Sequence, residues 1–399
     1  MADVKITNYD PLTTPAAADL FEIVDDVAGT PTSKKITWAD LFKAPTIITP
    51  DLGTPSAGDL ANCTGLPGSG LASGFPVLYE RSTQLARSAV DTVTVYEDTA
   101  VNVDGTIFIV AADTALELNT NATWDTGTAL NDAARAGHDY YVYACDNSGT
   151  LVLLVSADGT NPTGYTTSTS RKIGGFHCLC VAVGTIGGHT LTDFAQGDVL
   201  PASVWDIKHR PVSSPEGMVF SEEADIWVDI YLASGTGGST ASVNGGTISD
   251  TRDWNDFVDD FGAVKKQLLD DAEFQLIAAG SNEETNITGN SDPVTTGGHS
   301  DSAGRRMISN IGCEDCAGAM YQWLRDQSAK YDDAVAADWY NLPGSKGSLY
   351  RPVDTNDVKL LAGGSWVAAA LCGSRCRYAN RYRWLTSTHF GGRGRSRKL

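Results

Sequence analysis

Five runs between residues 90 and 186 constrain the fold more than any other part of this sequence. β-branched, aromatic and other apolar side chains dominate each run, and Gly, Asp and Asn turns separate one run from the next. The runs are VDTVTVYED, GTIFIVAAD, HDYYVYACD, TLVLLVSAD and KIGGFHCLCVAVGTI. No long amphipathic helix interrupts them, so residues 76–204 are predicted to form an all-β domain, a sandwich.

The chain is strongly acidic, which limits its partners. Its 399 residues hold 29 Lys and Arg against 49 Asp and Glu, a formal net charge of −20. Nucleic acids and anionic membranes require clustered Lys and Arg, so this composition argues against both as partners of most of the surface. The N-terminus lacks a basic segment followed by an apolar run, and no apolar stretch is long enough to span a bilayer. We therefore expect synthesis in a cytoplasm and no membrane insertion.

The eight cysteines are too sparse for a disulfide scaffold, and a cytoplasmic origin favours free thiols. Cys313 and Cys316 form a C-x-x-C pattern. In isolation that pattern suggests redox chemistry or half of a zinc site. Cys372 and Cys376 are a possible second pair.

Residues 1–44 are predicted to form a small attachment module. DLFEIVDD is expected to be a strand, and KKITWADLF is expected to end in a short helix capped by Thr37 or Asp40. Residues 45–75 are rich in Gly, Pro, Thr and Ser, which is typical of a flexible linker. Within them, TPDLGTPSAGDLANCTGLP resembles segments of phage tail-fibre and baseplate proteins that lie between the virion anchor and the distal domains.

Residues 205–399 are predicted to form a second domain of mixed type. VFSEEADIWVDIYLAS is strand-like, and a following helix, capped by Asp250 or Thr251, is indicated by apolar residues at helical spacing. These are Trp254, Phe257, Val258, Phe261, Val264 and Leu268. The loop 281–302 offers oxygen ligands for Ca²⁺ but lacks the EF-hand spacing, so we interpret it as an irregular surface loop. No metal or other cofactor is expected.

The closing stretch, residues 363–399, contains no Asp or Glu and eight cations, so residues 1–362 carry a net charge of −28. Its last cations are Arg393, Arg395, Arg397 and Lys398. Four cations without a broader basic surface are weak evidence for a nucleic-acid tail. We interpret them as alternate residues of a last strand that face solvent or pair with carboxylates of the acidic body.

Residues 309–328, SNIGCEDCAGAMYQWLRDQS, resemble the central strand motif of the formylglycine-generating-enzyme branch of the C-type lectin fold. The matching positions are Asn310, Gly312, Asp315, Gly318, Tyr321, Trp323 and Asp326. Gln322 replaces the usual acid. The segments AGGSW, CRYANR and GGRGRS then match the family's final strands in order. The resemblance covers about half of the chain and implies an α+β chain whose C-terminal domain has a C-type lectin fold, with Cys313 and Cys316 as core side chains.

The same segments resemble, more specifically, variable proteins of diversity-generating retroelements of the phage receptor-binding type (major tropism determinant-like). In that class a reverse transcriptase rewrites the C-terminal coding segment at template adenines. From the Asn codon AAC, Val, Ala, Leu, Tyr, Ser, Thr, His and Phe are reachable, whereas Trp, Lys, Glu and Met are not.

The resemblance thus implies a variable region at about residues 363–390. The candidate ligand-binding residues are Val367, Ala368, Ala369, Leu371, Tyr378, Tyr382, Leu385, Ser387, His389 and Phe390. The expected scaffold residues are Trp323, Gly363, Gly364, Trp366, Arg377 and Trp384. We expect the scaffold tryptophans and Arg377 to be buried or bonded, and Val367, Tyr378, Tyr382, Leu385 and His389 to be exposed together on one face.

The implied function is binding to a host cell-surface protein or glycan by a homotrimer in the virion tail. Its N-terminus would attach to other tail proteins, and the chain would be made in the host bacterial cytoplasm. Two alternatives stay open. A Cys oxidase similar to the formylglycine-generating enzyme would use Cys372 and Cys376, whose spacing is one residue shorter than that family's pair. The other alternative is an invariant structural fibre subunit.

Overall fold

The computed structural model describes residues 20–25, 32–37, 85–331, 338–341, 348–351 and 355–399, and the chain divides into two compact units, 1–65 and 66–399. In the first unit, β1 (Leu20–Asp25) pairs antiparallel with β2 (Thr32–Thr37). The strand predicted in DLFEIVDD is therefore confirmed. The short helix expected near Asp40 and the linker 45–75 lie outside the described residues.

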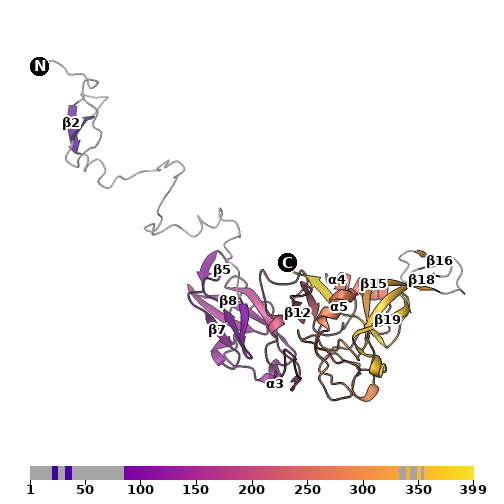
Figure 1. Cartoon of the computed structure of the whole chain (residues 1–399). Helices are drawn as coiled ribbons and strands as arrows, with labels where there is room; N and C mark the ends of the chain where they lie inside the picture. The colour runs from indigo at the N-terminus through magenta and orange to yellow at the C-terminus, as the bar shows by residue number, and fades with distance from the viewer. Residues whose placement is uncertain (1–19, 26–31, 38–84, 332–337, 342–347, 352–354) are drawn as a thin grey trace. The chain divides into compact units, whose positions relative to one another are not determined.

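Residues 85–206 form three antiparallel sheets, with strand orders β3-β4-β7, β5-β6 and β11-β10-β8-β9 (Figure 1). The bounds are β3 Leu85–Ala89, β4 Thr92–Val95, β5 Ala100–Val103, β6 Thr106–Ile109, β7 Thr114–Glu117, β8 Asp139–Asn147, β9 Thr150–Ser156, β10 Ser170–His177 and β11 Trp205–Asp206. Each run predicted to be β contains one of these strands. The alternation places Val93, Val142 and Ile173, all fully buried, in one shared core.

The remaining residues begin and end in one sheet. Its order is β12 (Met218–Ser221), β13 (Ile226–Asp229), β21 (Gly394–Arg397) and β14 (Gln267–Leu268). The single strand-like run VFSEEADIWVDIYLAS is a hairpin, because the chain turns before β13 at Asp225, which has a φ of +51°. β21 pairs antiparallel with β13, so the last strand returns beside the first strands of this half.

A second sheet carries the closing stretch. Its order is β19 (Gly373–Tyr382), β18 (Thr355–Gly363), β15 (Tyr321–Tyr331) and β20 (Phe390–Gly391). β20 runs parallel to β15, and the other pairs are antiparallel. A small hairpin of β16 (Asp338–Asn341) and β17 (Ser348–Arg351) lies between β15 and β18 in the chain. The described residues are thus mostly β, with few helices, whereas the sequence predicted an α+β chain.

The predicted helix is α4 (Trp254–Ala263), and its start and end differ from the prediction. Asp253, rather than Asp250 or Thr251, is the N-cap, and it forms a capping box with Asp256. Phe257 and Phe261 are buried as the spacing predicts, but Val258 is 40% exposed and Leu268 lies beyond the helix in β14. The helix ends early because the chain turns sharply at Lys265, which has a φ of +61°.

Two other short α-helices are described, α3 (Asp132–Arg135) and α5 (Asp271–Ile277). The loop 281–302 contains a single 3-10 turn, Thr288–Asn290, and isolated bridges, as expected of an irregular loop. Among the described helices, none combines the length and apolar character needed to cross a membrane.

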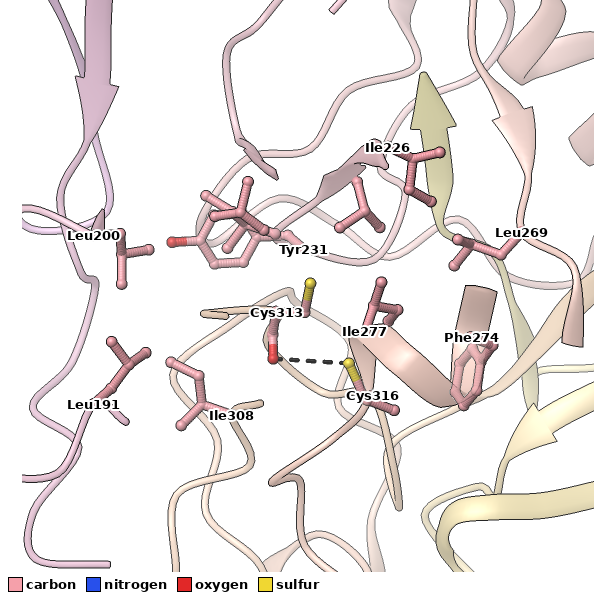
Figure 2. Close-up of a cluster of buried hydrophobic side chains, with 14 of the residues drawn as sticks. Leu191, Leu200, Ile226, Tyr231, Leu269, Phe274, Ile277, Ile308, Cys313 and Cys316 are labelled. Atoms are coloured by element: carbon pink, nitrogen blue, oxygen red, sulfur yellow. Dashed lines mark hydrogen bonds between the residues drawn. The ribbon is translucent and has the colours of Figure 1, made fainter. Parts of the chain in front are cut away.

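One hydrophobic core joins the two halves of the second unit, as Figure 2 shows. Leu191 and Leu200 from the first half belong to the same cluster as Tyr231 and Phe274 from the second, and Leu200 lies beside Tyr231 in Figure 2. Cys313 and Cys316 lie in this core as fully buried free thiols. Within the described ranges, no group of three His, Cys, Asp or Glu could hold a metal ion. The full burial of both thiols in this cluster fits the core interpretation of the C-x-x-C pattern.

Candidate functional site

Two glycines turn the chain from β18 into the closing loop. Gly363 and Gly364 have φ of +87° and +90°, a backbone conformation that other residues adopt only with strain. A Cβ on Gly363 would overlap the Cys316 carbonyl oxygen, and one on Gly364 would lie 2.7 Å from Cys372 Sγ. The N–H of Gly318 donates to both glycine carbonyl oxygens, at 3.3 and 3.2 Å. The glycine pair thus lets the 309–328 motif lie directly against the closing loop.

The loop after the glycines presents small and apolar side chains to solvent. Val367 is 52% exposed and Leu371 is 73% exposed. Ala369 is also exposed, and Ala368 is half-buried. Residues 369–371 form a 3-10 turn that holds these side chains in one short segment.

Trp366 anchors this loop. Its backbone N–H donates to the Ala319 carbonyl oxygen at 2.8 Å, and its backbone carbonyl oxygen accepts from the Asn286 side chain. The half-buried indole stacks on the His389 ring, with centroids 4.6 Å apart and planes 13° apart. The carbonyl oxygen of His389 accepts from the Tyr321 N–H at 2.9 Å, which ties the far end of the closing stretch to β15.

Aromatic rings continue from this point along β19. The ring centroids of Tyr321 and Tyr378 are 5.3 Å apart, and the Arg381 guanidinium lies 4.7 Å from the Tyr378 centroid. Arg377 of β19 is bonded to the Asp271 carboxylate and lies over the Phe274 ring. β19 is thereby fixed to the first turn of α5.

The segment after β19 is a second group of candidate residues. Tyr382 and Trp384 stack with centroids 5.3 Å apart, and the Leu385 N–H donates to the Tyr382 carbonyl oxygen at 3.0 Å. Ser387 accepts at its carbonyl oxygen from Thr251 N–H, at 3.1 Å. These candidate side chains are half-buried.

The expected face is less exposed in the structure than the sequence predicted. Of the five residues expected to be exposed together, Val367 is exposed, while Tyr378, Tyr382, Leu385 and His389 are half-buried. The difference has a physical cause, because their rings and the leucine pack on the scaffold through one side and leave the other side to solvent. His389 stacks on Trp366, at the start of the loop. Tyr378 packs against Tyr321, whose backbone N–H donates to the His389 carbonyl oxygen. Tyr382 and Leu385 follow farther along the chain.

Phe390 lies in the wrong place for a ligand-binding residue. It is 4% exposed, and its ring meets that of Trp323 edge-on with centroids 5.2 Å apart. Its strand, β20, pairs with β15 at the end of the sheet order, and both residues of β20 are buried. We therefore assign Phe390 to the scaffold, together with Trp323, which is 1% exposed.

The closing arginines also differ from the expectation. Arg393 neither faces solvent nor pairs with a carboxylate. It is 1% exposed and donates to the carbonyl oxygens of Asp229 and Ile230, at 2.7 and 2.6 Å, and to Gln322 Oε1 at 3.0 Å. Asp229 ends β13, Ile230 follows it and Gln322 lies on β15, so Arg393 links the two sheets.

The rest of the basic run follows the expectation more closely. Arg395 is buried with its Nε 3.5 Å from a Glu273 carboxylate oxygen, and Lys398 Nζ lies 2.6 Å from Asp225 Oδ1. Only the last cations, Arg397 and Lys398, are exposed. Such a run does not form a phosphate-binding tail.

The two closing cysteines are not activated nucleophiles. Burial raises the pKa of the Cys372 thiol to about 12, with neighbouring Cys376 adding to the effect. Burial also raises the pKa of Cys376, although Arg377 opposes the shift. Thiol oxidation chemistry needs the opposite shift, toward the thiolate.

Some residues of the closing stretch were missed as candidates. Ala370, Ala379, Asn380, Thr386 and Thr388 are exposed between the candidates. Their residue types could have identified them as candidates, because each is either Asn or a residue that can be reached from an Asn codon. Asn286 and Asp271, which position Trp366 and Arg377, could not have been found, because no local pattern relates residues 80 and 106 positions apart.

Comparison with known proteins agrees with this architecture. Residues 83–206 match the family model described as the Mtd second domain. The tail fiber receptor-binding protein of Bordetella phage BPP-1 is 28% identical over 334 residues, which cover 77% of this chain and 80% of that relative.

Solved structures extend the likeness to the C-terminal half. The Major Tropism Determinant U1 and M1 variants match with a TM-score of 0.67, at 26% and 27% identity, and each match covers 82% of this chain and 86% of the other. The fold is C-type lectin-like, as the closing motifs predicted. The chain is major tropism determinant-like, and the resemblance stated from its sequence is confirmed.

Proposed function

We propose that this chain is a phage tail-fibre receptor-binding protein whose closing stretch binds a receptor on the host surface. The observation that carries the proposal is the loop 367–371. Val367 and Leu371 project into solvent from a segment whose two ends are fixed by Gly364, Trp366 and Arg377. A rigid frame with exposed apolar side chains is suited to binding. The loop 367–371 carries no activated group that could catalyse a reaction. The chain is a binding protein rather than an enzyme.

The candidate face consists of Val367, Ala368, Ala369, Leu371, Tyr378, Tyr382, Leu385, Ser387 and His389. Its half-buried rings offer contact area with little loss of side-chain entropy, since the scaffold already fixes them. Its small residues set the shape of the surface. We propose that a retroelement rewrites these positions, because substitution of side chains that project from the frame changes the surface without unfolding it.

The architecture assigned to this function has several parts. Residues 1–44 attach the chain to other tail proteins, 45–75 are a linker, 76–204 form a β sandwich and 205–399 form the lectin-like domain. The chain is made in the host bacterial cytoplasm and incorporated into the virion tail. We propose a homotrimer, since a single face of this size binds weakly. Several copies engaged at once raise the functional affinity by about a hundredfold.

An adsorption-competition experiment tests the proposal. The purified full chain is added to host cells before phage, and the fraction of phage adsorbed is measured. Wild-type chain should reduce adsorption, and Leu371→Asp should lose that effect, because a charge replaces the most exposed apolar contact. Val294→Asp is the matched control, since Val294 is 61% exposed on a loop outside the closing stretch. Equal competition by both variants would show that the face does not bind the receptor.

A further inference from the structure

A cleft of about 690 Å³ lies away from the closing loop, between β10, residues 205–216 and the C-terminal end of α4. Arg171, Lys172, Arg210 and Lys265 line it, and Glu216 is its one acidic residue. The chain as a whole has 49 acids against 29 bases, so this local excess of cations is opposite to the rest of the surface. Its volume lies within the range of small-molecule sites.

Three of these cations have no carboxylate partner. Among the described residues, Lys172, Arg210 and Lys265 make no ion pair. The Lys172 ammonium instead lies 4.2 Å from the Tyr141 ring centroid, and Arg210 Nε donates to the Ile207 carbonyl oxygen at 3.2 Å. Three cations in one cleft, none of them in an ion pair with a described carboxylate, create a local positive potential that favours an anion.

The one acid of the cleft is engaged in a hydrogen bond with a neighbouring side chain. The Glu216 carboxylate accepts a hydrogen bond from the Tyr141 hydroxyl at 3.0 Å. Burial lowers the pKa of Lys172, Glu216 and Asp158 oppose that shift, and Arg210 adds to it. A bound anion would relieve the repulsion between Lys172 and Arg210.

The cleft also has an apolar wall and a hydroxyl. Trp205, Ile207 and Val212 contribute apolar surface, and the exposed Ser214 contributes a hydroxyl group. Apolar wall, hydroxyl and cations together match a sugar ring that carries an acidic group. A peptide strand fits less well, because β11, at the edge of its sheet, is two residues long and offers almost no ladder to extend.

The closing residues of the chain are hydrogen-bonded to the segment that lines this cleft. The Val212 N–H donates to the Arg397 carbonyl oxygen at 3.0 Å, and the Leu399 N–H donates to the Arg210 carbonyl oxygen at 2.8 Å. The exposed end of the basic run therefore lies along the segment that carries Arg210.

We propose that this cleft is a second binding site, for a pyranose sugar bearing a carboxylate or phosphate group. Lys172, Arg210 and Lys265 bind the acidic group, and the wall around Trp205 packs on the sugar ring. The site is separate from the candidate face, so it stands or falls independently of the proposed function.

Calorimetric titration of the full chain tests this proposal, with galacturonic acid, glucose 6-phosphate, glucose, inorganic phosphate and a hexaglutamate peptide as probes. At least one acidic sugar should bind, at least tenfold more tightly than glucose and than phosphate alone. A tetramer of galacturonic acid separates the two sources. Tighter binding of the tetramer supports a polymeric surface glycan, whereas equal binding supports a free acidic sugar.

The double variant Arg210→Gln, Lys265→Gln should weaken acidic-sugar binding at least tenfold. Lys208→Gln is the control, because Lys208 is exposed near the cleft without lining it. Thermal unfolding of each variant verifies that the fold is intact. Unchanged binding by the double variant, binding of glucose or phosphate as tight as that of the acidic sugars, or preferential binding of hexaglutamate would overturn the proposal.

Discussion

Gly364→Ala should be among the most damaging single-methyl changes in the closing stretch. The residue has a φ of +90°, and an added Cβ would lie 2.7 Å from Cys372 Sγ and 2.9 Å from Cys372 Cα. The backbone strain costs about 1–2 kcal/mol. Forcing a methyl group into a packed contact costs about 1–3 kcal/mol more. We therefore expect a loss of about 2–5 kcal/mol in the free energy of unfolding.

Gly105→Ala is a matched control for the backbone term. Gly105 has a φ of +91°, and nothing lies within 4 Å of its added Cβ. It should lose only the strain, about 1–2 kcal/mol. Urea unfolding of both variants, followed by tryptophan fluorescence, gives the difference from the midpoints at equal slope. If Gly364→Ala costs no more than Gly105→Ala, the close contact between Gly364 and Cys372 does not hold the loop.

Three further predictions concern the frame. Arg393→Met leaves buried carbonyl oxygens without a donor, so urea unfolding should show a loss of about 3–5 kcal/mol in the free energy of unfolding. The control Arg397→Met, at an exposed residue, should lose under about 0.5 kcal/mol. Similar losses in the two variants would contradict the role of Arg393. Burial alone lowers the pKa of His299, but Asp315, 2.9 Å from Nδ1, raises it above its ordinary 6.5. The stability that this pair contributes is therefore complete below pH 6.5 and is lost as the pH rises through the raised pKa. His299→Gln should remove this pH dependence from the free energy of unfolding measured as a function of pH. An unchanged pH dependence would refute the assignment. Cys372→Ser should leave host adsorption unchanged, since the thiol is buried with a pKa of about 12; loss of a peptide-thiol oxidation activity in that variant would instead support the oxidase alternative.

Much of the frame could be predicted because its signals are local. Alternating apolar residues located β4, β8 and β9, and the helical spacing of Phe257 and Phe261 located α4. The scaffold role of the Gly363–Gly364 pair could also be predicted, because only glycine adopts a positive φ without strain where other atoms lie this close. The cap of α4 was misplaced by two or three residues, since Asp250, Thr251 and Asp253 are all acceptable caps by residue type.

What could not be predicted depends on distant partners. The alternation of the last strand predicts that Arg393 faces solvent. It is buried instead, because it donates to the carbonyl oxygens of Asp229 and Ile230, more than 160 residues away in the sequence. Phe390 has a residue type that the closing stretch could vary, but its pairing with β15 and its contact with Trp323 bury it. Burial of single residues in the closing stretch is thus set by the sheet rather than by the local pattern.

Sequencing the last forty or so codons of this gene across a phage population, with any adenine-rich repeat and reverse transcriptase gene nearby, tests the central claim most directly. Substitutions should concentrate at Val367, Leu371 and Tyr382, whose side chains are exposed or half-buried. Gly364 and Phe390 should stay fixed, because one has no room for a Cβ and the other is buried. An invariant 3′ end without a repeat would support a structural fibre subunit. Substitutions as frequent at Gly364 and Phe390 as at Val367 would contradict a rigid frame that carries a variable face.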